Sequence, residues 1–218
     1  MKRFEIIAEA DARVLAHGET VMLARGDTVT LAKGGHVTPL AQDTLRERRV
    51  TIVHEWRASS DEAALAPRPE IRTIAIASDH TGVKLRRELV TFLRGRGLAV
   101  QDLGTDGPDP VDYPDVAASV ADLVACGDAD GGIVIDGAGI GSAIAANKIR
   151  GIRAVMANSE TLARYAREHN GANVLTLGAT LVSPDEARAI VTTWLTTPMR
   201  EPRYIRRLAK IRDLERRD

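Results

Sequence analysis

The stretch from Ile133 to Lys148, which reads IVIDGAGIGSAIAANK, constrains the fold more than any other part of the chain. Its β-branched apolar start leads into Asp136, and alternating glycines then precede a helix-like segment. This order predicts a buried strand, a turn of bare backbone and a helix N-terminus. N–H groups and the helix dipole at such a turn favour a small polar or anionic ligand. Because open α/β sheets bind ligands at the carboxyl ends of their strands, Asp136 is a candidate functional residue.

The chain from about residue 71 onward alternates between predicted strands and predicted helices. Runs of β-branched and aliphatic residues predict strands at 73–77, 98–102, 132–135, 152–156 and 173–177. Apolar residues between them recur at helical spacing, and a last helix is predicted over 201–217. This alternation predicts an α/β domain over 71–218, in which helices cover both faces of a parallel sheet.

Residues 1–56 predict a smaller module of mixed α/β or β structure. Val21–Leu23 and Thr28–Leu31 flank a turn-like ARGD and suggest a hairpin. Thr38 followed by Pro39 predicts a helix start, and residues 50–53 predict a strand. The segment 57–70 contains Ser-Ser, two prolines and no hydrophobic period, so we expect it to be a linker.

Charge and composition narrow the classes of partner. The chain has 30 basic and 30 acidic residues, and only 3% of its residues are aromatic, which argues against binding to nucleic acid or a membrane surface. The one cysteine, Cys126, excludes an internal disulfide and fits a reducing compartment. No apolar run is long enough to cross a membrane and no signal region opens the sequence, so we expect a soluble cytoplasmic protein.

Two polar segments share the predicted sheet edge with Asp136. Asp79 and His80 follow the first strand of the main domain and could bind a substrate hydroxyl and an anion. A helix-capping aspartate with an incidental histidine is the commoner arrangement. Tyr113 precedes a proline-started helix, where it could donate a hydrogen bond to a ligand or be an ordinary loop residue.

Two further segments have both a functional and a structural interpretation. His169 and Asn170 end a predicted helix, where an imidazole could act as acid or base or could simply stabilise the helix C-terminus. Arg203 and Arg207 lie four residues apart on the last helix and could clamp a phosphate or form a solvated basic face. For each segment taken alone, the structural interpretation is the commoner one.

The sequence lacks the motifs typical of several nucleotide-binding and metal-binding sites. The glycines of GAGIG do not form GxGxxG and follow the third strand of the domain, which disfavours a dinucleotide fold. The chain has no GK[ST] sequence and no Cys/His cluster with metal-ligand spacing.

The order of the blocks is more specific than any one block. SDHTG, DYP, the glycine stretch, GIRA, REHNGANVL and RYIRR follow one another over residues 72 to about 215. In this order the chain resembles the ribose-5-phosphate isomerase B / galactose-6-phosphate isomerase family. The resemblance implies a Rossmann-like, three-layer α/β/α sandwich with a five-stranded parallel sheet, built as a homo-oligomer (dimer or tetramer). It also implies aldose–ketose isomerisation of a sugar phosphate at a site between subunits, with no metal or cofactor.

The resemblance divides the site between two subunits. One subunit would hold the sugar with Asp79, Tyr113 and the loop residues Gly137, Ala138, Gly139, Gly141 and Ser142, while His80 would face the phosphate. The other subunit would supply His169, Asn170, Arg203 and Arg207. His169 resembles the group that opens the sugar ring.

The chain departs from the family pattern at the reacting centre. The usual base is a cysteine at the position of Asp136 or, in a second branch, a glutamate at the position of Ser142. The threonine or serine usual at Ala138 and the arginine common at Thr180 are also absent. Asp136 could serve as the base if burial raises its pKa. Alternatively, the chain is a non-catalytic sugar-phosphate-binding or partner subunit, because an aspartate at that position resembles the companion subunit of galactose-6-phosphate isomerase.

The N-terminal module carries one short resemblance of its own. Residues 35–50, GHVTPLAQDTLRERRV, are similar to segments of enzymes from bacterial microcompartment operons. This similarity implies association with a microcompartment through the N-terminal module.

Overall fold

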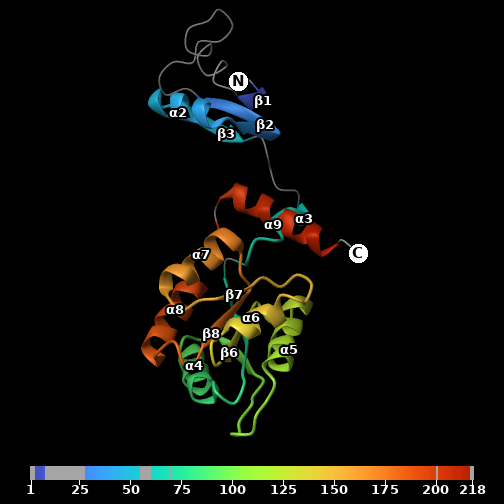
Figure 1. Cartoon of the computed structure of the whole chain (residues 1–218), viewed down its shortest axis with the longest axis vertical. Coiled ribbons are helices and arrows are strands. Elements are labelled where there is room, and N and C mark those ends of the chain that lie inside the picture. The colour runs from blue at the N-terminus through green and yellow to red at the C-terminus, as the bar shows by residue number, and fades with distance from the viewer. Residues whose placement is uncertain (1–2, 8–27, 55–59, 69, 200, 217–218) are drawn as a thin grey trace, which may run out of the picture. The chain divides into compact units, whose positions relative to one another are not determined.

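The computed structural model describes residues 3–7, 28–54, 60–68, 70–199 and 201–216. The chain divides into two compact units, Met1–Arg57 and Ala58–Asp218, which are described separately (Figure 1). None of the helices in the described ranges combines the length and apolar character needed to span a membrane. The same ranges contain no cluster of three or more acidic, histidine or cysteine residues able to hold a metal ion.

The first unit contains a small parallel sheet and one helix. Its strands are β1 (Arg3–Ile7), β2 (Thr28–Val37) and β3 (Thr51–His54), in the order β1-β2-β3, and its helix is α2 (Pro39–Glu47). The predicted helix start is confirmed, since Thr38 is the N-cap residue and Pro39 opens α2. Of the suggested hairpin, Val21–Leu23 lies outside the described residues, and β2 pairs in parallel with both β1 and β3.

The second unit is a five-stranded parallel sheet between helices. Its strands are β4 (Thr73–Ser78), β5 (Ala99–Asp102), β6 (Gly131–Asp136), β7 (Ala154–Met156) and β8 (Val174–Gly178). Its helices are α3 (Ser60–Ala63), α4 (Val83–Gly95), α5 (Tyr113–Cys126), α6 (Ile140–Ala146), α7 (Glu160–Asn170), α8 (Pro184–Thr196) and α9 (Pro202–Glu215). The strand order is β5-β4-β6-β8-β7, with every neighbouring pair parallel. The predicted strands and the three-layer fold are confirmed.

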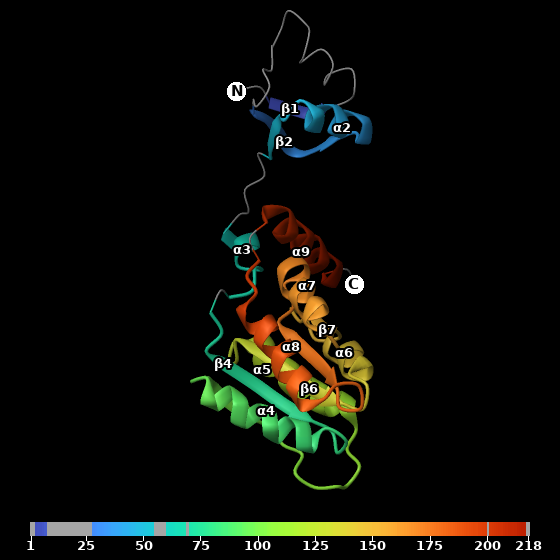
Figure 2. The same ribbon diagram turned by 90° about the vertical axis from the view of Figure 1, so that its left-hand side faces the viewer.

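Alternate side chains of each strand enter opposite layers, as the pleat requires. In β4, Ile74 and Ile76 join a core with α4, α7 and α8, whereas Ala75 and Ala77 join a core with α5 and α6. The two helical layers are visible on either side of the sheet in Figure 2. The chain leaves β4 toward β5 on one side and reaches β6 on the other. This reversal places a crevice at the carboxyl ends of β4 and β6, where such sheets bind ligands.

The segment 57–70, expected to be a linker, belongs to the second unit from Ala58 onward. Helix α3 packs against α9, and the carbonyl oxygens of Leu65 and Arg68 accept hydrogen bonds from arginine side chains of the second unit. The expectation was wrong because these contacts are made largely through backbone carbonyls. Hydrophobic periodicity carries no information about such contacts.

Candidate active site

The predicted site residues lie at opposite edges of the sheet. In a parallel sheet, loops that follow strands gather at the carboxyl edge, and the helices run back to the amino edge. Asp79, Tyr113 and the loop after β6 are therefore at the carboxyl edge, and we call them the carboxyl-edge half-site. His169 and Asn170 end α7 at the amino edge, where α9 packs against α7 (Figure 2). With Arg203 and Arg207 of α9, they form what we call the amino-edge half-site.

The carboxylate of Asp136 organises the glycine loop. Its Oδ1 accepts hydrogen bonds from the N–H groups of Ala138, at 2.8 Å, and Gly139. Its Oδ2 accepts hydrogen bonds from the N–H of Ser142, at 2.9 Å, and from the Ser142 hydroxyl. Both oxygens of this buried side chain are thus occupied by donors from the loop that follows it.

The pKa of Asp136 is shifted downward, opposite to the shift that a catalytic base needs. Burial of the carboxyl favours its neutral form, but the hydrogen bonds from Ser142, Gly139 and Ala138 together outweigh burial and hold the pKa below its ordinary value. The condition for Asp136 to serve as the base, a pKa raised by burial, is therefore not met. Burial in this loop comes with hydrogen-bond donors that stabilise the charged form.

Strand β8 fixes the other side of the glycine loop. The Thr176 hydroxyl donates a hydrogen bond to the Gly139 carbonyl, and the Thr180 hydroxyl donates one to the Gly137 carbonyl, each at 2.6 Å. Gly139 has a φ of 77°, and a Cβ there would lie 2.9 Å from the carbonyl carbon of Leu177. Thr180, where the family pattern commonly has an arginine, therefore anchors the loop in this chain.

Tyr113 lies against the same loop. A Cβ on Gly141 would lie 2.6 Å from Cε2 of the Tyr113 ring, so the ring packs on the glycine. Tyr113 remains 42% exposed although it contacts the loop. The structure thus brings Tyr113 to the carboxyl edge together with Gly141.

The two oxygens of Asp79 have different surroundings. Oδ1 accepts hydrogen bonds from the N–H and hydroxyl of Thr81, at 2.8 and 2.6 Å, and from the N–H of Gly82, at 3.2 Å. These bonds close the turn that precedes α4. The N-cap of α4 is Gly82, with no side-chain cap hydrogen bond, so the interpretation of Asp79 as the helix cap is wrong. Within the described residues Oδ2 has no hydrogen-bond partner, which leaves it available to a substrate.

His80 lies on the opposite side of that turn. Its Nδ1 accepts a hydrogen bond from the N–H of Val111 at 3.4 Å. With Lys84 and Arg87, it lines a cavity of 480 Å³. Glu88 and Asp106 line the same cavity, so its charge is mixed, and the expectation that His80 faces an anion stays a prediction.

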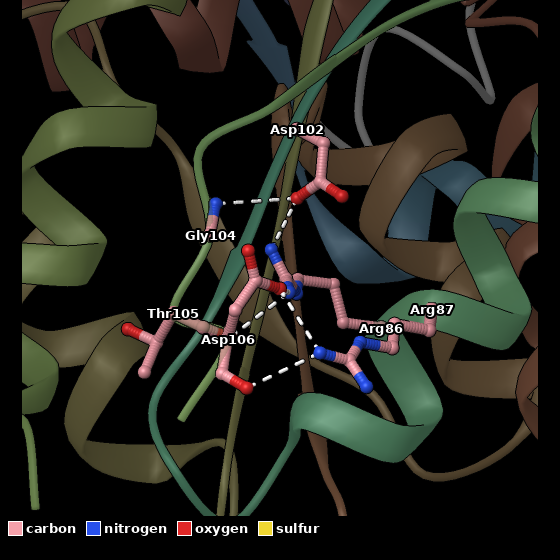
Figure 3. Close-up of polar contacts among 6 residues, drawn as sticks. All are labelled: Arg86, Arg87, Asp102, Gly104, Thr105 and Asp106. Carbon is pink, nitrogen blue, oxygen red and sulfur yellow. Dashed lines mark hydrogen bonds and ion pairs between the residues drawn. The ribbon is translucent and has the colours of Figure 1, made fainter. Parts of the chain in front are cut away.

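Arg86, which is not among the predicted site residues, holds the loop between β5 and Tyr113. Its buried guanidinium binds Asp102, donates to the Thr105 carbonyl at 2.9 Å and to Asp106 at 2.6 Å (Figure 3). The hydrogen bonds from Arg86 and then Arg87 lower the pKa of Asp106. Arg86 could have been found from its spacing, since it lies three, four and seven residues before Leu89, Val90 and Leu93 on the apolar face of α4.

The amino-edge half-site is assembled around Tyr204. The His169 ring stacks on Tyr165 with 4.7 Å between centroids, and its centroid lies 4.7 Å from that of Tyr204 on α9. The guanidinium carbons of Arg203 and Arg207 lie 4.9 and 5.7 Å from the Tyr204 ring centroid. One buried tyrosine, whose role the sequence analysis did not anticipate, thus joins three predicted residues.

Asn170 belongs to the same edge. Its side-chain amide donates a hydrogen bond to the Tyr165 carbonyl at 3.2 Å. It also lines a 510 Å³ cavity together with Arg153, Ile211 and Leu214. The two half-sites do not meet within one chain.

Known proteins match this chain in sequence and in fold. The family described as Ribose/Galactose Isomerase matches residues 74–211. Ribose-5-phosphate isomerase B of Escherichia coli is 42% identical over 147 residues, which are 67% of this chain and 99% of that protein. The structure of ribose-5-phosphate isomerase B from Clostridium thermocellum superposes with a TM-score of 0.65 at 48% identity, covering 66% of this chain and 97% of that one.

A third comparison includes a bound sugar phosphate. Ribose-5-phosphate isomerase B of Mycoplasma genitalium, solved with bound ribulose-5-phosphate, has a TM-score of 0.65 at 40% identity and covers 67% of this chain and 97% of its own. The N-terminal unit precedes the matched residues. From the matched residues and the shared fold, the chain belongs to the ribose/galactose isomerase family.

Proposed function

We propose that the protein isomerises a small sugar phosphate between its aldose and ketose forms through an enediol. The substrate is ribose 5-phosphate with ribulose 5-phosphate, or a related four- to six-carbon sugar phosphate. Family membership over residues 74–211 carries the proposal, supported by the two half-sites. No cofactor is required, because the reaction moves hydrogen between neighbouring carbons of one molecule.

The active form is a homodimer or a larger assembly of dimers. Each site combines the carboxyl-edge half-site of one subunit with the amino-edge half-site of its partner, since the sheet separates the two within a chain. Exposed apolar side chains occur near both half-sites, Ile140 and Ile144 on α6 and Ile211 and Leu214 on α9. Such residues favour burial against a second copy.

Asp79 is the proton carrier in this proposal. Its free Oδ2 takes the proton from C2 of the aldose and returns it to C1, while the hydroxyl proton moves from O2 to O1. His169 of the partner subunit transfers a proton at the ring oxygen and opens the sugar. Asp136 is the anchor of the glycine loop, because both of its oxygens are already occupied.

The experiment uses the purified full chain in deuterated water. Sugar phosphates of four to six carbons are supplied one at a time, and NMR follows interconversion and deuterium entry at C1 or C2. In Asp79→Asn the amide oxygen still accepts the hydrogen bonds from Thr81 and Gly82, so the fold is retained while turnover falls by about 10²- to 10⁴-fold. A wild-type rate in this variant would remove Asp79 from the mechanism.

A second candidate function is a non-catalytic sugar-phosphate-binding or partner subunit. Both oxygens of the Asp136 carboxylate, at the position of the family's usual base, already accept hydrogen bonds from the loop, which favours the non-catalytic function. The same assay distinguishes the two functions. Binding of one sugar phosphate by calorimetry, with no interconversion of any, would support the second.

The N-terminal unit serves assembly in a cytoplasmic bacterial microcompartment. Supporting this, α2 buries Ala41 and Leu45 but leaves Leu40 58% exposed, as a docking helix would. A fluorescent protein fused to residues 1–56 is expected to form foci in bacteria that produce such compartments. Diffuse fluorescence there would contradict this role.

A further inference from the structure

Residues 60–68, which we call the strap, precede the part of the chain matched by the family and pack at the amino edge. Helix α3 opens the strap and packs against α9, the helix of Arg203 and Arg207. Farther along, Pro67 covers the turn that ends α7. A Cβ on Gly171 would lie 3.3 Å from Cδ of Pro67 and 2.8 Å from Cδ1 of Leu208 on α9.

Two arginines connect the strap to this turn. Arg153 donates from Nε to the Gly171 carbonyl, at 2.8 Å, and from Nη2 to the Leu65 carbonyl, at 3.2 Å. Arg167 donates from Nη1 to the Ala172 carbonyl at 3.0 Å and, from Nη2, to a strap carbonyl at 3.1 Å. Each guanidinium therefore joins one strap carbonyl to one carbonyl directly after His169 and Asn170.

The strap carbonyls accept hydrogen bonds from arginine side chains that are largely buried. The Arg167 side chain is almost fully buried, with its guanidinium carbon 5.1 Å from the centroid of the Trp194 ring. Burial, and then the charge of Arg153, lower the pKa of Arg167 to about 10, so it stays charged at neutral pH. A buried cation that loses an acceptor is costly, and the strap supplies one acceptor to each arginine.

The far end of the strap is fixed to the sheet. Arg68 forms an ion pair with Asp130, whose other oxygen accepts hydrogen bonds from the N–H groups of Arg72 and Thr73, each at 2.9 Å. These bonds hold the chain at the start of β4. The strap is thus attached at α9, at the end of α7 and at the amino end of β4.

We infer that the strap is a positioning element for substrate binding, added ahead of the family's domain. It holds the ends of α7 and α9 in the arrangement that presents His169, Arg203 and Arg207 to the sugar phosphate. The inference rests on the proposed function. If so, the strap contributes to the affinity for the substrate and does not merely connect the N-terminal unit to the second unit.

The test replaces residues 60–68 of the full chain with a Gly/Ser segment of equal length. We expect KM for the sugar phosphate that wild type turns over to rise about tenfold, with a smaller change in kcat, because the clamp is displaced. The NMR signal of the His169 ring, assigned by its loss in His169→Gln, is expected to shift as Tyr165 and Tyr204 move relative to it. A role in stability alone would lower the melting temperature and leave both readouts unchanged.

A single substitution keeps the test decisive if the replaced segment prevents folding. Arg68→Ala removes the ion pair with Asp130, and Glu70→Ala is its control, since it removes only the exposed pair with Arg72. Only Arg68→Ala is expected to shift the His169 signal. A folded strap variant with wild-type KM and His169 signal, or an unshifted signal in Arg68→Ala, would overturn the inference. Absence of turnover in wild type would instead count against the proposed function, while the His169 signal would still report on the strap.

Discussion

At the scale of single residues, Asp79 and Asp136 show how two strand-end aspartates acquire different roles. Asp79 directly follows β4 and Asp136 is the last residue of β6, so both lie at the same edge, and both are almost fully buried. Asp136 has donors on both oxygens, whereas Asp79 has them on Oδ1 alone among the residues described. The position of a carboxylate therefore does not identify the base. We propose Asp79 as the base because its Oδ2 is unoccupied among the described residues.

Asp136→Asn is expected to destabilise the protein. The Asn side chain would direct an NH₂ group toward the N–H and hydroxyl of Ser142, where donors would face donors. The lost hydrogen bonds cost about 1–3 kcal/mol. Urea unfolding would measure this loss, and kcat would fall in part because the loop loosens. Unchanged stability with complete loss of turnover would identify Asp136 as the base.

The lowered pKa of Asp136 also predicts a pH dependence of stability. A depressed folded-state pKa contributes stability that is fully present above the ordinary value of 3.8 and is lost as pH falls through the folded-state pKa. The free energy of unfolding should therefore fall more steeply with acidification in wild type than in Asp136→Asn. Urea titrations at about pH 5 and pH 3 measure the difference. Parallel losses would show that this carboxylate is not coupled to folding.

At the scale of elements, α9 brings two cations to one side of Tyr204. Arg203 donates a hydrogen bond to the Tyr204 hydroxyl at 3.1 Å, and Arg207 lies one turn farther along. If they clamp the phosphate, Arg203→Ala or Arg207→Ala should raise KM about 10- to 100-fold, since a charge-assisted contact contributes about 1.5–3 kcal/mol. Steady-state kinetics measure the change. Arg216→Ala, at the exposed end of the same helix, is the matched control. If KM is the same in this control as in the other two variants, the clamp lies elsewhere.

The sequence predicted the elements of the fold but not the contacts that complete the site. β-branched runs located the strands, and the β-α alternation determined a parallel sheet, because both depend on local pattern. The partners of Asp136 were not predictable, since they depend on how residues 137–142 turn back onto its carboxylate. The strap was also missed, because its carbonyl contacts with Arg153 and Arg167 join residues about 90 to 100 positions apart, irrespective of side-chain pattern.

For the whole molecule, the proposed site needs two subunits, because the sheet separates its two half-sites within one chain. A single chain holds the proposed proton carrier Asp79 at one edge and the proposed phosphate clamp at the other. In a two-fold dimer the carboxyl edge of each subunit can face the amino edge of the other, which makes two equivalent sites. Activity should therefore depend on protein concentration wherever dilution separates the subunits, which sedimentation and assay at matched concentrations would reveal.

Mixing two variants, each impaired in a different half-site, tests this arrangement directly when the assay uses substrate well below the raised KM of Arg207→Ala. Asp79→Asn lacks the proposed carboxyl-edge base, and Arg207→Ala lacks part of the amino-edge clamp. A mixed dimer contains one site with both changes and one site with neither. Random exchange of equal amounts makes half of the dimers mixed, so about a quarter of wild-type activity should return. Wild-type subunits mixed with themselves control for losses during exchange. Recovery absent despite subunit exchange, shown by native mass spectrometry, would mean that each site is built within one chain.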